Sequence, residues 1–152
     1  MSERSSRLKK RLQIDRIGTL AAMIIVFIFA IAHIVCFARF GDSIYVSKSI
    51  LCIVGTVSFF LLYLILKHIE VTGRPFDEKI IKLMRVIAFT LIIGGFIAPC
   101  GAFVADVIKY SKAEYLFNGF DLIIPVIGII VGIISEIFVY GKDLQEDNDL
   151  IA

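Results

Sequence analysis

The sequence contains little of what catalytic and metal-binding sites usually require. Among its 152 residues are three cysteines and two histidines, and no two cysteines form a Cys-x-x-Cys pair. A nucleophile–base pair, a phosphate-cradling glycine loop and a cluster of metal ligands are all missing from the sequence. We therefore expect a protein that is not an enzyme and that needs no cofactor.

The cysteines and one histidine are expected to have structural roles. On the topology derived below, Cys36, Cys52, Cys100 and His33 all lie in the outer half of a bilayer, a placement that allows a four-ligand metal site. Thiols buried in lipid resist ionisation, however, and the thiolate is the form that binds a metal. We interpret the cysteines as small apolar side chains and His33 as a hydrogen-bonded histidine.

Charge is also missing from four long stretches. Residues 17–38, 49–66, 86–105 and 122–135 contain no Asp, Glu, Lys or Arg, and 59% of the whole sequence is hydrophobic. A helix needs about 20 mostly apolar residues to cross a bilayer, and ordinary globular domains are only about 45–50% apolar. The sequence therefore predicts an all-α integral membrane four-helix bundle, with too little chain outside the lipid for a soluble catalytic domain.

The expected organisation has three parts. A basic arm (1–16) precedes a single transmembrane domain (17–141), and an acidic tail (142–152) follows it. Within the transmembrane domain, the spans are placed at 17–38, 45–66, 84–106 and 119–140.

The basic residues are unevenly distributed between the two sides of these spans. Six lie in the arm, five in the second loop and one in the tail, whereas the first and third loops hold two each. Cytoplasmic segments of membrane proteins carry an excess of Lys and Arg, so both termini and the second loop are predicted to be cytoplasmic. The arm is expected to contact anionic lipid and not nucleic acid, because no groove-reading module accompanies it.

Glu136 is the most informative single residue. The uncharged run 122–135 would extend only about 21 Å as a helix, against about 30 Å of hydrocarbon, so the fourth span must include Glu136. A carboxylate at that depth normally faces protein or water. We expect Glu136 to cap the bundle near headgroups or Lys142, to contact a pocket, or to act as a protonatable switch. Asp106 and Asp121 are expected to be solvated span ends, and Gly141 to cap the fourth helix.

Small residues recur on one face of each of the last two spans. They are Gly94, Ala98 and Ala102 in the third span and Gly128 and Gly132 in the fourth. Small residues four positions apart let helix backbones approach closely in lipid. The third and fourth spans are therefore predicted to pack along these faces.

The second loop contains a predicted turn. Gly73 and Pro75 favour a turn, with Pro75 in the first turn of a new helix. The residues that follow alternate between apolar and basic at helical spacing, which indicates an interfacial helix that leads into the third span. Phe76 is expected to anchor this segment among the headgroups.

Two segments carry a resemblance to a known family. The first is the turn Gly73-Arg74-Pro75-Phe76. The second is the C-terminal pattern of Glu136-Ile137-Phe138, Gly141, Leu144 to Asp147 and Asp149-Leu150. Both segments resemble the YoaS-like family. These are small four-span proteins of bacterial cell membranes with a domain of unknown function, so the resemblance implies no catalytic residues. Similar proteins are often encoded beside a Cro/C1-type helix-turn-helix regulator. Their usual ending resembles Asp-Leu-Thr-Val, whereas this chain ends Leu150-Ile151-Ala152.

Three functions remain open at this stage. The first is a membrane-bound regulator whose tail binds a cytosolic partner, such as a helix-turn-helix protein, by presenting acidic and apolar groups to a basic face. The tail residues proposed for this contact are Leu144, Gln145, Glu146, Asp147 and Asp149. The second is a small transporter or channel subunit with Glu136 as its coupling carboxylate. The third is a structural subunit of a membrane complex, and a homo-oligomer is compatible with each.

Overall fold

A computed structural model describes residues 3–111 and 119–151. These residues form four long helices, α1 (Glu3–Phe40), α2 (Ile44–Thr72), α3 (Glu78–Tyr110) and α4 (Ile123–Ile151), with a short 3₁₀ turn, η1 (Gly119–Leu122), before α4. Each long helix contains a segment that is long and apolar enough to cross a membrane. The all-α class is confirmed, and four membrane-spanning helices make the chain a multi-pass membrane protein in contact with lipid.

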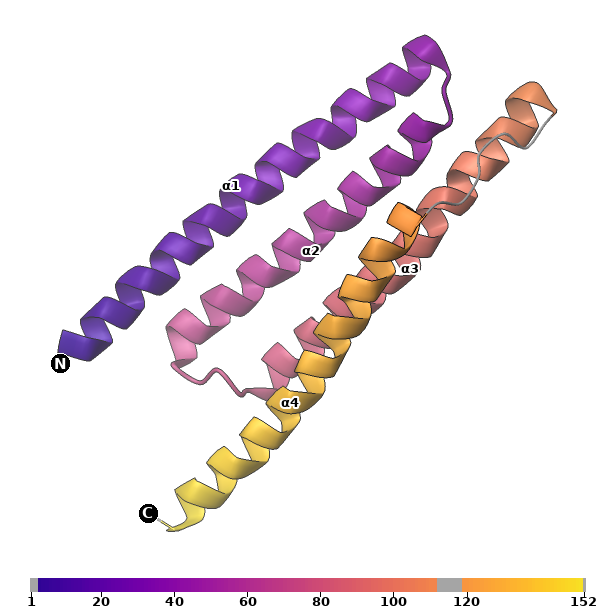
Figure 1. The fold of residues 1–152 in the computed structure, drawn as a ribbon. Helices are drawn as coiled ribbons and strands as arrows, with labels where there is room; N and C mark the ends of the chain where they lie inside the picture. The colour runs from indigo at the N-terminus through magenta and orange to yellow at the C-terminus, as the bar shows by residue number, and fades with distance from the viewer. Residues whose placement is uncertain (1–2, 112–118, 152) are drawn as a thin grey trace.

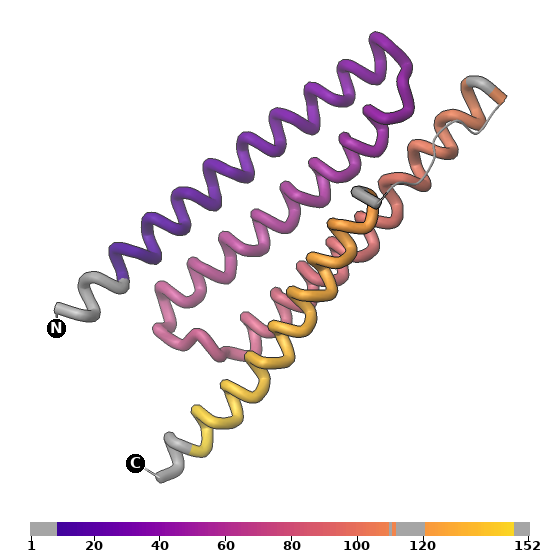
Figure 2. The backbone as a smooth tube through the Cα atoms, viewed as in Figure 1, coloured from indigo at the N-terminus to yellow at the C-terminus, as the bar shows by residue number. Residues whose placement is uncertain are grey.

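The long helices lie side by side in the order of the sequence (Figure 1). Each runs antiparallel to the one before it, so the start of α1 and the end of α4 lie at the same end of the molecule (Figure 2). Within the described residues, α1 contacts only α2 among the long helices, and α4 contacts only α3. The bundle is therefore open, because its first and last helices do not meet.

The connection from α2 to α3 is a turn that starts at Gly73. This glycine has a φ of 68°, and its N–H donates to the Ile69 carbonyl at 2.8 Å. It therefore ends α2 in the left-handed conformation that glycine adopts without strain. α3 begins only at Glu78, after Asp77. The prediction that Pro75 lies in the first turn of the new helix is wrong, because Pro75 belongs to the preceding turn.

Both ends of the chain are more helical than predicted. α1 begins at Glu3, so the arm and the first span form one helix, and α4 continues through Gly141 to Ile151. The prediction that Gly141 caps the fourth helix is therefore wrong. At about 1.5 Å per residue the 29 residues of α4 extend about 43 Å, which exceeds the roughly 30 Å of hydrocarbon. The tail is thus a helical extension of the last span.

The end of the molecule that holds both termini has a small apolar core. Ile65, Ile80 and Ile87 are buried there, and Val131 and Phe138 of α4 pack against them. An ion pair attaches α1 to α2 at the same end, with Arg16 Nη1 2.5 Å from Glu70 Oε2.

The small residues of α3 do not all face α4 as predicted. A Cβ on Gly94 would collide with Val54, so Gly94 packs against α2. The neighbouring Gly95 faces α4 instead, since a Cβ there would lie 2.5 Å from Cδ of Pro125. Ala98 and Ala102 are fully buried.

The two glycines of α4 do lie against α3. A Cβ on Gly128 would lie 2.9 Å from the Ala88 carbonyl oxygen and 2.9 Å from the Ile92 nitrogen. One turn later, a Cβ on Gly132 would meet Ala88 Cβ at 3.7 Å, an ordinary van der Waals contact. Close approach of the two backbones therefore depends on Gly128 more than on Gly132.

This difference predicts opposite outcomes for two matched variants. Gly128→Ala should lower the melting temperature in detergent, because backbone atoms of α3 cannot move away cheaply and overpacking costs about 1–3 kcal/mol. Gly132→Ala, the control, should leave the melting temperature unchanged or raise it, because alanine favours the helix. Equal losses in both variants would contradict the packing described here.

Candidate functional site

Phe76 joins the turn after α2 to the last part of α4. Its ring centroid lies 5.2 Å from that of Phe138. A Cβ on Gly141 would lie 2.7 Å from both Cδ1 and Cε1 of the Phe76 ring. Gly141 is thus the residue that lets the ring lie against the helix backbone. The half-buried ring packs on protein, and the expectation that Phe76 also anchors the loop among headgroups stays a prediction.

Polar groups from the same two segments surround this contact. Arg74 and Asp77 from the turn, and Lys142, Gln145 and Glu146 from α4, line a hollow of about 90 Å³ together with Phe76. Lys142 Nζ lies 3.5 Å from Glu146 Oε1 along the helix. We call residues 73–77 and 138–146 together the turn–α4 junction. It brings together the two segments that carry the family resemblance.

The turn itself is fixed to α2 by a histidine. His68 Nε2 donates a hydrogen bond to Asp77 Oδ2. This hydrogen bond from His68 holds the pKa of the Asp77 carboxyl below its usual range. Asp77 immediately precedes α3, so the pair ties the start of α3 to the end of α2 and positions Phe76 between them.

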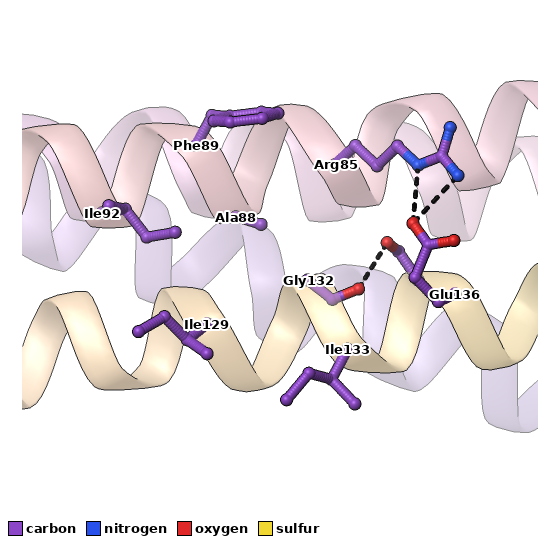
Figure 3. Close-up of a pocket in the computed structure, with 9 residues that line it drawn as sticks. Arg85, Ala88, Phe89, Ile92, Ile129, Gly132, Ile133 and Glu136 are labelled. Carbon is purple, nitrogen blue, oxygen red and sulfur yellow. Dashed lines mark hydrogen bonds and ion pairs between the residues drawn. The ribbon is translucent and has the colours of Figure 1, made fainter.

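Glu136 pairs with an arginine of α3. Arg85 donates to Glu136 Oε1 from Nη2 at 2.9 Å and from Nε at 3.2 Å, as Figure 3 shows. Lys142, which was considered as a partner, pairs with Glu146 instead. The side chains of Arg85 and Glu136 are 46% and 60% exposed, so the pair lies on the surface of the helix pair and not inside it.

A groove begins at this ion pair and follows α3 and α4 into the apolar region. It encloses about 410 Å³ and is lined by residues of α3 from Arg85 to Ile92 and of α4 from Ile129 to Glu136. Ser135 is fully buried at its edge, with its hydroxyl donating to the Gly132 carbonyl at 2.7 Å. Glu136 therefore contacts a pocket, which was one of the arrangements expected for it.

The outer face of the tail helix is exposed. Leu144 is 66% exposed, and Asp143 and Asp147 on the same stretch are also exposed. Gln145 faces the turn. Asp149, the last proposed contact residue, lies outside the residues whose side chains are described.

The remaining candidates are the histidine, the cysteines and the span-end aspartates. No group of three or more His, Cys, Asp or Glu side chains that could hold a metal ion occurs within the described residues. His33 Nδ1 donates to the Phe29 carbonyl at 2.7 Å and lies 3.9 Å from Cys52 Sγ, as expected of a hydrogen-bonded histidine. Asp106 is only 4% exposed, so the prediction of a solvated span end is wrong for it.

Comparison with known proteins identifies the family. Residues 37–151, which include all of α2, α3 and α4, match DUF2975, a protein family of unknown function. The chain belongs to the DUF2975 family. Comparisons with curated proteins and with solved structures found no match. This match does not test the YoaS-like resemblance, which stays a prediction.

Sequence reasoning found Phe76 and Glu136 in this DUF2975 protein but missed their partners. Arg85 counted only as one of several basic loop residues, yet a usable signal existed. Arg85 directly precedes the third uncharged run and Glu136 directly follows the fourth. Consecutive antiparallel spans place such residues at the same depth, which predicts their pairing.

The Phe76 contact predicts a change of sign in a double-mutant cycle. Gly141→Ala alone should lower the melting temperature in detergent, because the new methyl group collides with the Phe76 ring. In a Phe76→Ala background the same substitution should raise it, because alanine is about 1 kcal/mol better than glycine within a helix. The same effect of Gly141→Ala in both backgrounds would show that the ring does not lie on this glycine.

Proposed function

We propose that this protein is a membrane-bound regulator that holds a soluble cytosolic partner on the exposed face of its tail helix. The observation that carries the proposal is the two-sided character of the tail. One side packs on the turn through Gly141 and Gln145, and the other presents Asp143, Leu144 and Asp147 outward.

A tail held in this way is better suited to binding than a disordered one. A disordered segment loses conformational entropy when it binds, whereas a helix already fixed by Phe76 has lost most of that entropy in folding. The exposed apolar Leu144 supplies an anchor, and the flanking carboxylates favour a basic partner. A DNA-binding protein presents such a basic face. Proteins of the family that this chain resembles are often encoded beside a helix-turn-helix regulator, which motivates this choice of partner.

The proposal requires both termini to be cytoplasmic, in a bacterial cell membrane. The excess of Lys and Arg in the arm and second loop supports this orientation. The start of α1 and the end of α4 lie at the same end of the molecule, as it demands.

Transport through Glu136 is the second candidate. The contact between Glu136 and a groove favours it, but the groove runs along the outer surface of α3 and α4 with exposed apolar walls. Glu136 is also paired with Arg85 at the surface of the helix pair and not inside it. A role as a structural subunit or homo-oligomer is compatible with the exposed side of α1, and no further observation favours it.

Orientation can be tested by cysteine labelling of intact cells, in a background where Cys36, Cys52 and Cys100 are replaced by serine. A cysteine at Ser111 should react with an impermeant maleimide from outside. A cysteine at Ser6 should react only after permeabilisation. The reverse pattern would contradict the proposed orientation and with it the cytosolic partner.

Partner binding can be tested with paired variants of the tail. Leu144→Ala combined with Asp147→Lys should leave insertion intact yet release a co-expressed, genetically neighbouring helix-turn-helix protein from the membrane fraction. Loss of an interface anchor and a favourable charge should weaken binding by at least about tenfold, which is about 1.4 kcal/mol. Gln145→Ala, on the inner face, is the control and should retain the partner. If the helix-turn-helix protein stays soluble beside the unmodified chain, the regulator proposal fails.

A further inference from the structure

The groove between α3 and α4 has a feature that the proposed function does not use. It combines an apolar trough with two opposite charges at one end. Arg85 comes from α3 and Glu136 from α4, and their side chains point toward each other across the mouth of the groove (Figure 3).

The trough has the shape of a short acyl-chain site. From Arg85 to Ile92, and from Ile129 to Glu136, each helix advances by about 10 Å at 1.5 Å per residue. Ala88 and Gly132 make the floor, where small side chains leave room between the helices. Phe89 and Ile133 form the walls and are 63% and 59% exposed, so the groove opens sideways into the bilayer.

The polar end is only partly satisfied by the protein. Both hydrogen bonds from Arg85 go to one oxygen, Oε1 of Glu136. Within the described residues, Glu136 Oε2 and Arg85 Nη1 make no hydrogen bond. One anionic and one cationic ligand group can therefore bind next to each other without breaking the ion pair.

We propose that this groove binds a phospholipid whose zwitterionic headgroup carries a primary ammonium, of the phosphoethanolamine type. Arg85 binds the phosphate, Glu136 accepts a hydrogen bond from the ammonium, and an acyl chain lies over Ala88 and Gly132. The anionic headgroup of phosphatidylglycerol fits less well, because it has no ammonium to bind Glu136 and to offset the negative charge of its phosphate. A choline headgroup fits less well, because its quaternary ammonium has no N–H to donate. The inference does not depend on the tail or on a protein partner.

The test measures lipid binding to the full-length protein, delipidated in detergent, by native mass spectrometry. The probes are phosphatidylethanolamine, phosphatidylglycerol and phosphatidylcholine with the same acyl chains. We expect phosphatidylethanolamine to bind about tenfold more tightly than phosphatidylcholine, because hydrogen bonds to charged groups are among the strongest in proteins. Soluble glycerophosphoethanolamine should not compete, since it lacks the acyl chains that fill the trough. Equal binding of the three lipids would show non-specific annular association and overturn the proposal.

Two variants separate the roles of the charges. Glu136→Gln should abolish the preference for phosphatidylethanolamine while keeping phosphate binding, and Arg85→Gln should weaken the binding of all three lipids. The matched controls are Glu78→Gln and Lys82→Gln. They alter an exposed ion pair on α3 outside the groove, in which Lys82 Nζ lies 2.7 Å from Glu78 Oε1. Both controls should bind the three lipids as the unmodified protein does. A Glu136→Gln protein that still prefers phosphatidylethanolamine would contradict the assignment.

A steric pair tests the trough without altering charge. Ile133→Trp fills the groove and should reduce lipid binding, whereas Ile134→Trp, which lies on the same helix outside the groove lining, should not. Melting temperatures identify any variant that fails to fold. If Arg85→Gln is such a variant, the Glu136→Gln and tryptophan variants still decide the question. Equal loss of binding in the two tryptophan variants would overturn the proposal.

Discussion

The contact between α3 and α4 determines how the rest of the molecule can act. In lipid, apolar surface gains little by leaving one hydrocarbon environment for another, so helices associate through close packing and polar contacts. Among the described long helices α4 has only α3 as a neighbour, and it approaches α3 at Gly128 and at Gly95. The groove lies along this contact, and the turn–α4 junction lies beyond the groove, after the uncharged run of α4 has ended. Both candidate sites therefore depend on the same helix pair.

Phe76 stabilises the end of α4 that extends beyond its apolar segment. A helix that extends past the lipid loses the surroundings that favoured it, and isolated helical segments are marginal in water. The Phe76 ring on Gly141 and Phe138 supplies tertiary packing just beyond the uncharged run of α4. The extension of α4 through Leu144 is thus fixed by the turn at residues 73–77, which is distant in sequence. The hydrogen bond between His68 and Asp77 fixes that turn.

Four long apolar helices could be predicted from the sequence, whereas the partners of individual residues could not. Charge is so costly in hydrocarbon that its absence from four runs is a reliable signal. A sequence pattern predicts the direction that a helical residue faces only to within about one residue, or 100° of rotation. It therefore could not show which of Gly94 and Gly95 faces α2 and which faces α4. Gly141 shows a second limit. Glycine usually ends a helix, and its actual role, to admit Phe76, depends on a residue distant in sequence.

Two ion pairs that join described helices differ in how easily a ligand can rearrange them. Arg16 and Glu70 are 31% and 20% exposed and join α1, which has no other helix neighbour in the described structure, to α2. Arg85 and Glu136 are 46% and 60% exposed and join helices that glycines already hold together. Exposed pairs of this kind contribute only about 0–1 kcal/mol to stability. The fold therefore depends little on Arg85 and Glu136, which leaves their charges available to recognise a headgroup at small cost to the packing of α3 and α4.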